Sequence, residues 1–102
     1  MSRHMVYFLE HPQYFGELPK KMDIQEFFIN YKPVEILQAD SLEEVYSRMQ
    51  GENWSPNGEM RDFILAQGIN HTSMSIGDVV YSQEDDKFYM VDRFGFEELI
   101  LK

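Results

Sequence analysis

Five polar residues in the C-terminal third have side chains of the kinds that a hydrolytic site uses: His71, Ser73, Ser75, Asp78 and Asp92. A nucleophilic site needs a hydroxyl, a base and an orienting carboxylate within hydrogen-bond reach of one another. These residues supply all three types, so a small hydrolase built on His71, Ser73 and Asp78 is one hypothesis. No nucleophile elbow of the Gly-x-Ser-x-Gly kind occurs. The favoured interpretation is that the serines and Asp78 hydrogen-bond the backbone of a tight turn leading into a strand.

Metal and cofactor chemistry has little support in the residue pattern. The chain has no cysteine, and its histidines, His4, His11 and His71, are scattered without metal-ligand spacing. The acidic run Glu84-Asp85-Asp86 lacks the spacing of a calcium-binding loop. The isolated glycines match no phosphate-binding loop. We therefore expect neither a metal nor a cofactor.

Two features are candidate protein-binding surfaces. Trp54, the only tryptophan, lies in a polar segment that ends in Ser55-Pro56-Asn57-Gly58, and aromatic side chains dominate interface hot spots. The alternative is that Trp54 folds back over the helices to close the core. Glu84, Asp85 and Asp86 form the second candidate surface, and their simpler interpretation is a solvated hairpin tip.

The charge of the chain restricts its partners. Eighteen acidic and nine basic residues give a net charge of −9, which disfavours direct nucleic-acid binding because phosphate neutralisation needs clustered Lys and Arg. An acidic surface can instead attract basic partners, or it can simply keep the protein in solution. A sharper hypothesis is an inhibitor that imitates nucleic acid and occupies the basic groove of a host defence or nucleic-acid enzyme.

Apolar spacing and capping residues indicate the elements that position these side chains. Asp23 with Glu26, and Ser41 with Glu44, form capping boxes before apolar stripes at helical spacing, and the first stripe includes Phe28 and Tyr31. The expected elements are strands at 6–9, 34–39, 79–81 and 88–92, an edge strand at 99–101, and helices at 23–31, 41–49 and 59–67. This pattern predicts one α+β domain over residues 1–102, a small antiparallel sheet with two or three short helices packed on one face.

One stretch resembles a known family. His71-Thr72-Ser73-Met74-Ser75-Ile76-Gly77-Asp78-Val79-Val80, then Tyr89-Met90-Val91-Asp92 and Gly95-Phe96, is similar to a pattern in the YodL-like domains of phages, plasmids and integrated elements. The resemblance is good over residues 71–96 and looser over 34–46. It implies a mobile-element origin and an accessory role, and it implies no reaction.

Together these observations predict a small, acidic, non-catalytic protein-binding accessory domain. We expect a protein partner, no direct nucleic-acid contact, and either a monomer or a homodimer. No apolar run approaches the ~20 residues of a membrane span, so the expected location is cytoplasmic and away from the membrane.

Overall fold

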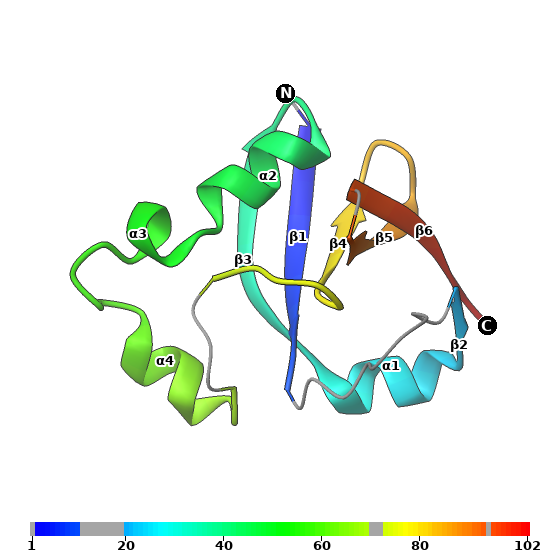
Figure 1. Cartoon of the computed structure of the whole chain (residues 1–102). Helices are drawn as coiled ribbons and strands as arrows, with labels where there is room; N and C mark the ends of the chain where they lie inside the picture. The colour runs from blue at the N-terminus through cyan, green and yellow to red at the C-terminus, as the bar shows by residue number, and fades with distance from the viewer. Residues whose placement is uncertain (1, 11–19, 70–72, 94) are drawn as a thin grey trace.

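The described strands form one mixed sheet that runs through the molecule (Figure 1). The computed structural model describes residues 2–10, 20–69, 73–93 and 95–102. In spatial order the six strands are β2-β6-β5-β4-β1-β3. The elements are β1 Ser2–Leu9, β2 Lys21–Met22, α1 Ile24–Asn30, β3 Tyr31–Ala39, α2 Leu42–Arg48, α3 Gly51–Trp54, α4 Arg61–Ala66, β4 Val79–Ser82, β5 Lys87–Asp92 and β6 Gly95–Leu101.

β1 lies inside the sheet and is buried on both faces. It pairs antiparallel with β3 on one side and β4 on the other. Successive side chains of a strand point to opposite faces. Val6 and Phe8 accordingly join one apolar cluster, whereas Tyr7 and Leu9 join another. The continuous apolar run at residues 5–9 therefore reflects a strand covered from two directions.

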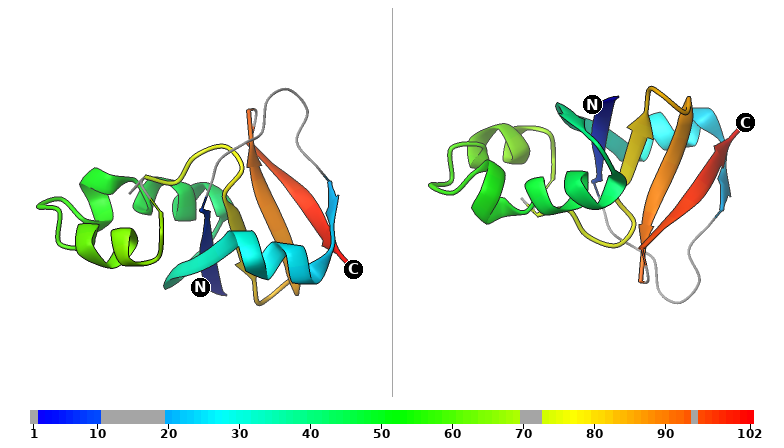
Figure 2. Two further views of the ribbon diagram at one scale, coloured as in Figure 1. Left: turned by 90° about the horizontal axis from the view of Figure 1, so that it is seen from below. Right: turned by 90° about the horizontal axis from the view of Figure 1, so that it is seen from above.

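Helices cover both faces of this sheet. Phe27 of α1 packs with the cluster around Tyr7, while Val45 of α2 and Ile64 of α4 pack with the cluster around Phe8. Figure 2 shows α1 in front of the strands from below and α2 in front of them from above. The expectation of helices on one face is wrong, because a central strand that is apolar on both faces needs cover on both.

The α+β class is confirmed, but the sheet is larger than the small antiparallel sheet expected. Most neighbours are antiparallel, and the two-residue strand β2 pairs in parallel with β6, which makes the sheet mixed. The expected edge strand at 99–101 is the end of a longer strand, β6, and β2 lies beyond it. The acidic hairpin loop is the tight segment 83–86 between β4 and β5.

Both predicted helix caps are confirmed. The Asp23 carboxylate accepts hydrogen bonds from the backbone N–H groups of Gln25 and Glu26 at 3.0 and 3.1 Å, and Ser41 Oγ accepts one from Glu44 at 3.1 Å.

The far end of the first helix differs from the prediction. Tyr31 lies in β3, where its ring stacks on Phe27 at a centroid distance of 4.6 Å, and Phe28 is 50% exposed. The helix ends one residue earlier because Pro33 cannot continue it and the backbone before a proline favours extended conformations.

Candidate functional site

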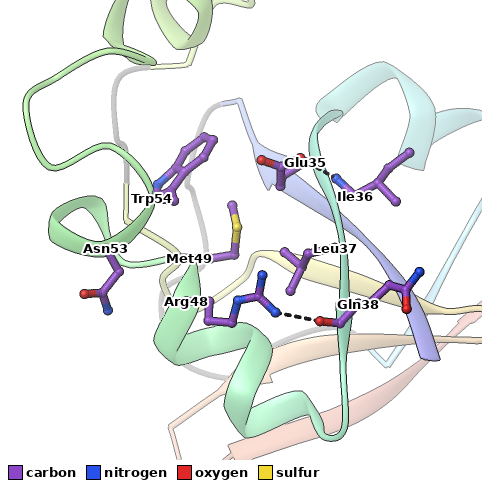
Figure 3. Close-up of a pocket in the computed structure, with 8 residues that line it drawn as sticks. All are labelled: Glu35, Ile36, Leu37, Gln38, Arg48, Met49, Asn53 and Trp54. Atoms are coloured by element: carbon purple, nitrogen blue, oxygen red, sulfur yellow. Dashed lines mark hydrogen bonds between the residues drawn. The ribbon is translucent and has the colours of Figure 1, made fainter. Parts of the chain in front are cut away.

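A groove opens between β3, an edge strand of the sheet, and the helices α2 and α3 (Figure 3). Its volume is about 520 Å³. Leu37, Met49 and Trp54 give it a small apolar part, and polar and charged side chains line the rest. The lining residues are Glu35, Ile36, Leu37, Gln38, Arg48, Met49, Asn53 and Trp54.

Trp54 closes the core, as the alternative interpretation predicts, and it also lines the groove. Its ring meets the buried Phe8 ring edge-on at a centroid distance of 6.0 Å, so it helps to close the core. The side chain is only partly buried, and its remaining surface lines the groove. Trp54 is therefore held by the core on one side and exposed to the groove on the other.

Two charged side chains at the groove rim bond to the backbone of β3. Arg48 Nη1 donates to the carbonyl oxygen of Gln38 at 2.5 Å and lies 3.6 Å from the carboxylate of Glu44. Glu35 Oε1 accepts the backbone N–H of Ile36 at 2.9 Å. The groove thus has a cation and an anion beside its apolar centre.

The hydroxyls of the two serines in the proposed hydrolytic cluster have different partners. Ser73 Oγ accepts the N–H of Gly51 at 2.8 Å, at the start of α3. Asp78, 1% exposed, accepts the N–H of Ser75 and the N–H of Leu9, each at 2.8 Å, while Ser75 Oγ donates to it at 3.4 Å. Asp78 therefore caps the turn before β4, as the turn interpretation predicts, and it also fastens that turn to the end of β1.

Asp92 has a different arrangement. Asp92 Oδ1 accepts the N–H of its neighbour Arg93 at 2.6 Å. Asp92 also lines a second pocket, of about 340 Å³, between the outer side of α2 and the start of β6. His71 lies outside the described residues. Among the described members, Ser75 with Asp78 is the hydroxyl–carboxylate pair brought together, and its hydroxyl is already a hydrogen-bond donor.

The acidic hairpin tip is held by tyrosines. Tyr81 Oη donates to Asp86 at 2.5 Å, and Tyr89 Oη donates to Asp85 at 3.1 Å. The hydrogen bond to Asp86 raises the pKa of Tyr81, and desolvation followed by the bond to Asp85 raises that of Tyr89. Glu84, Asp85 and Asp86 are all exposed, as a solvated tip predicts.

Acidic side chains are distributed over both layers of helices and over the sheet. They occur on α1, on α2, at the hairpin tip and on β6. Bridges to basic side chains among the described residues include Lys20–Glu97, Lys32–Glu10, Arg48–Glu44 and Lys87–Glu98. Within residues 2–10, 20–69, 73–93 and 95–102, no three His, Asp or Glu side chains are grouped to hold a metal ion.

Sequence reasoning identified Trp54 but missed Glu35, Ile36, Gln38 and Arg48. The available signal was Pro33 at the entrance of a strand, since proline in a sheet marks an edge.

Comparison with protein-family models, curated proteins and solved structures finds no match to this chain. Among the helices of the described segments, none has the length and apolar character needed to span a membrane.

Proposed function

We propose that this chain is a non-catalytic protein-binding domain and that the groove beside β3 is its binding surface. The observation that carries the proposal is an open groove of about 520 Å³ in which Trp54 stands beside Leu37 and Met49, with Arg48 and Glu35 at the rim. Protein-binding sites combine a desolvated aromatic or apolar centre with a polar rim that fixes orientation.

The groove is suited to a protein more than to a phosphate-bearing ligand. Arg48 is the only cation among its lining residues, and Glu35 lies in the same groove. A nucleic-acid site needs several cations along one surface. A mixed rim instead matches a polypeptide, which carries both signs of charge and both backbone donors and acceptors. We also propose that this binding serves an accessory role in a phage or mobile element, as the YodL-like resemblance implies.

Neither alternative has comparable support. A charge mimic needs carboxylates gathered on one face, whereas here they occupy elements on opposite faces of the sheet and several are paired. A hydrolase needs a free hydroxyl near a base, whereas Ser73 accepts from Gly51 and Ser75 donates to Asp78. The hairpin tip at Glu84–Asp86 remains the second candidate surface for a protein partner.

Site-specific photo-crosslinking in bacterial cells tests the groove directly. Benzoylphenylalanine is placed at Asn53 in the groove, at Asp85 in the hairpin, or at Gln25 on α1, three exposed positions. We expect one dominant heteromeric product from Asn53 and none from Gln25. Reversing the rim charge with Arg48→Glu should deplete the Asn53 product, whereas Lys87→Glu should leave it.

The position of crosslinking decides between surfaces. A dominant product from Asp85 alone would transfer the binding function to the hairpin. Equal products from all three positions would mean non-specific contact, and the groove would then have no special role.

A further inference from the structure

The hydrogen bonds of β1 show which of its backbone N–H and C=O groups point to β4 and which point to β3. The N–H of Gln83 donates to the carbonyl of Arg3 at 3.1 Å, and the N–H of Leu9 donates to Asp78 at 2.8 Å. Both partners lie on the β4 side. In an antiparallel strand the backbone groups of alternate residues point to opposite neighbours. The odd-numbered residues of β1 therefore face β4, and the even-numbered residues face β3.

It follows that the backbone N–H and C=O groups of alternate β3 residues point away from the sheet. His4 lies opposite Leu37 in the β1–β3 register, so the backbone of Leu37 points inward to β1. Ile36 and Gln38, on either side of Leu37, point outward, into the open edge. The Ile36 side chain is 52% exposed on the face covered elsewhere by α1.

Side chains occupy these outward backbone groups in the free protein. The Ile36 N–H is bound by Glu35, and the Gln38 carbonyl is bound by Arg48. These two contacts supply an acceptor and a donor at the spacing of alternate strand residues, which is the pattern that a neighbouring strand would supply. Both side chains come from the groove rim.

We propose that the partner contributes an extended segment that joins the sheet as a further strand beside β3, inside the groove. Its backbone carbonyl accepts from Ile36 N–H, and its backbone N–H donates to the Gln38 carbonyl, in place of Glu35 and Arg48. Main-chain bonds of this kind give affinity, and alternate side chains give specificity. This inference rests on the proposed protein-binding function.

The groove also specifies the side chains of the segment. A residue lying opposite Leu37 directs its side chain to the α2 face, where the partly exposed Trp54 ring stands beside the buried Leu37 and Met49. An apolar side chain fits there. Displacement frees Glu35 and leaves Arg48 with its bridge to Glu44, so the segment has an acidic residue near Arg48 and a basic residue near Glu35. The occupant is thus an extended peptide with an apolar residue between opposite charges.

A second copy of this chain does not fit the same edge. Figures 1 and 2 show α3 and α4 projecting past β3, on the side away from β1. Antiparallel pairing of two β3 edges about a two-fold axis would place both sets of helices on one face, directed at each other. A segment without helices on that face avoids this collision.

The test selects 12-residue peptides from a random displayed library on the immobilised full chain, then measures synthetic versions of the enriched peptides. Each backbone nitrogen of a peptide is methylated in turn. We expect losses of about tenfold or more at every second residue and small effects between them, because only alternate N–H groups face β3. Arg48→Glu should weaken binding by a similar factor, and Lys87→Glu, a matched change at an exposed site, should not.

Three outcomes would overturn strand addition: failure to enrich any peptide, losses without a two-residue period, or equal binding to the Arg48→Glu and Lys87→Glu proteins. None of them alters the crosslinking result from Asn53, which decides the protein-binding function separately. A specific Asn53 crosslink combined with aperiodic methylation losses would mean a groove that binds protein in another conformation.

Discussion

Replacing Asp78 with alanine removes the acceptor of two backbone N–H groups in a nearly closed environment. The Leu9 N–H is buried and the Ser75 N–H is partly buried, and each donates to Asp78 at 2.8 Å. An unsatisfied buried donor costs about 1–3 kcal/mol. We therefore expect Asp78→Ala to lower the free energy of unfolding by about 2–6 kcal/mol, a large part of the total for a small domain.

Urea unfolding followed by Trp54 fluorescence measures this loss, because Trp54 is the only tryptophan and packs against Phe8. With a denaturant slope of about 1–3 kcal/mol per molar, the urea midpoint falls by at least about 0.7 M. Asp92→Ala is the control. It makes the same change in net charge, but the Asp92 side chain accepts the N–H of its exposed neighbour Arg93, and we expect a loss below about 1 kcal/mol.

The two variants together test the reasoning. Asp78→Asn retains one carbonyl acceptor and should lie between wild type and Asp78→Ala, which keeps the series measurable if the alanine variant does not fold. Equal stabilities of the Asp78→Ala and Asp92→Ala proteins would refute the structural role of Asp78. Stability would then have no dependence on the link between β1 and the turn before β4.

Two further changes concern a helix cap and the hairpin. Ser41→Ala removes the cap of α2 and should cost about 1 kcal/mol in the same urea assay, whereas Ser47→Ala, exposed within that helix, should cost little. Asp86→Gly keeps the left-handed backbone at φ 54° and removes the acceptor of Tyr81, so the pKa of Tyr81 should fall toward 10.0 in an NMR titration of the tyrosine Cζ signal. The folded protein holds the Tyr81 proton more tightly than the unfolded chain does. The stability that this bond contributes is therefore fully present below the ordinary tyrosine pKa and is lost as the pH rises through the raised pKa of the folded protein. An unchanged Tyr81 pKa in Asp86→Gly would show that the bond to Asp86 does not cause the rise.

Elements specified by local sequence could be predicted, and elements that depend on distant partners could not. The caps at Asp23 and Ser41 use side chains within three residues of the groups they bind, so the sequence shows them directly. β2 has two residues and exists because β6, almost eighty positions later, pairs with it. α3 was not predicted; it begins at Gly51, whose N–H is bound by Ser73, twenty-two positions away.

The candidate site also combines a residue that the local sequence indicates with residues that only the tertiary structure brings together. Trp54 could be singled out because a lone tryptophan in a polar segment needs a reason to be there. Arg48 and Gln38 meet only because α2 packs back on β3, and their side-chain-to-carbonyl bond joins two elements. Nothing in the composition of α2 distinguishes Arg48 from any other exposed helical cation. The alternating backbone directions of β3 also required the sheet order, which places this strand at an edge.

The nine-residue edge strand raises the question of how the free protein avoids unspecific pairing, since exposed strand edges promote aggregation. Glu35 and Arg48 answer it by binding the outward N–H of Ile36 and the outward carbonyl of Gln38. Both side chains are exposed, and exposed charged contacts contribute only about 0–1 kcal/mol each. A hydrophobic edge without matching charges would have to displace these contacts, which would remove the bond of Glu35 and leave Arg48 with its bridge to Glu44. A segment with an acid and a base in the right positions supplies both residues with new partners. The same two residues therefore protect the edge and select the chemistry that can open it.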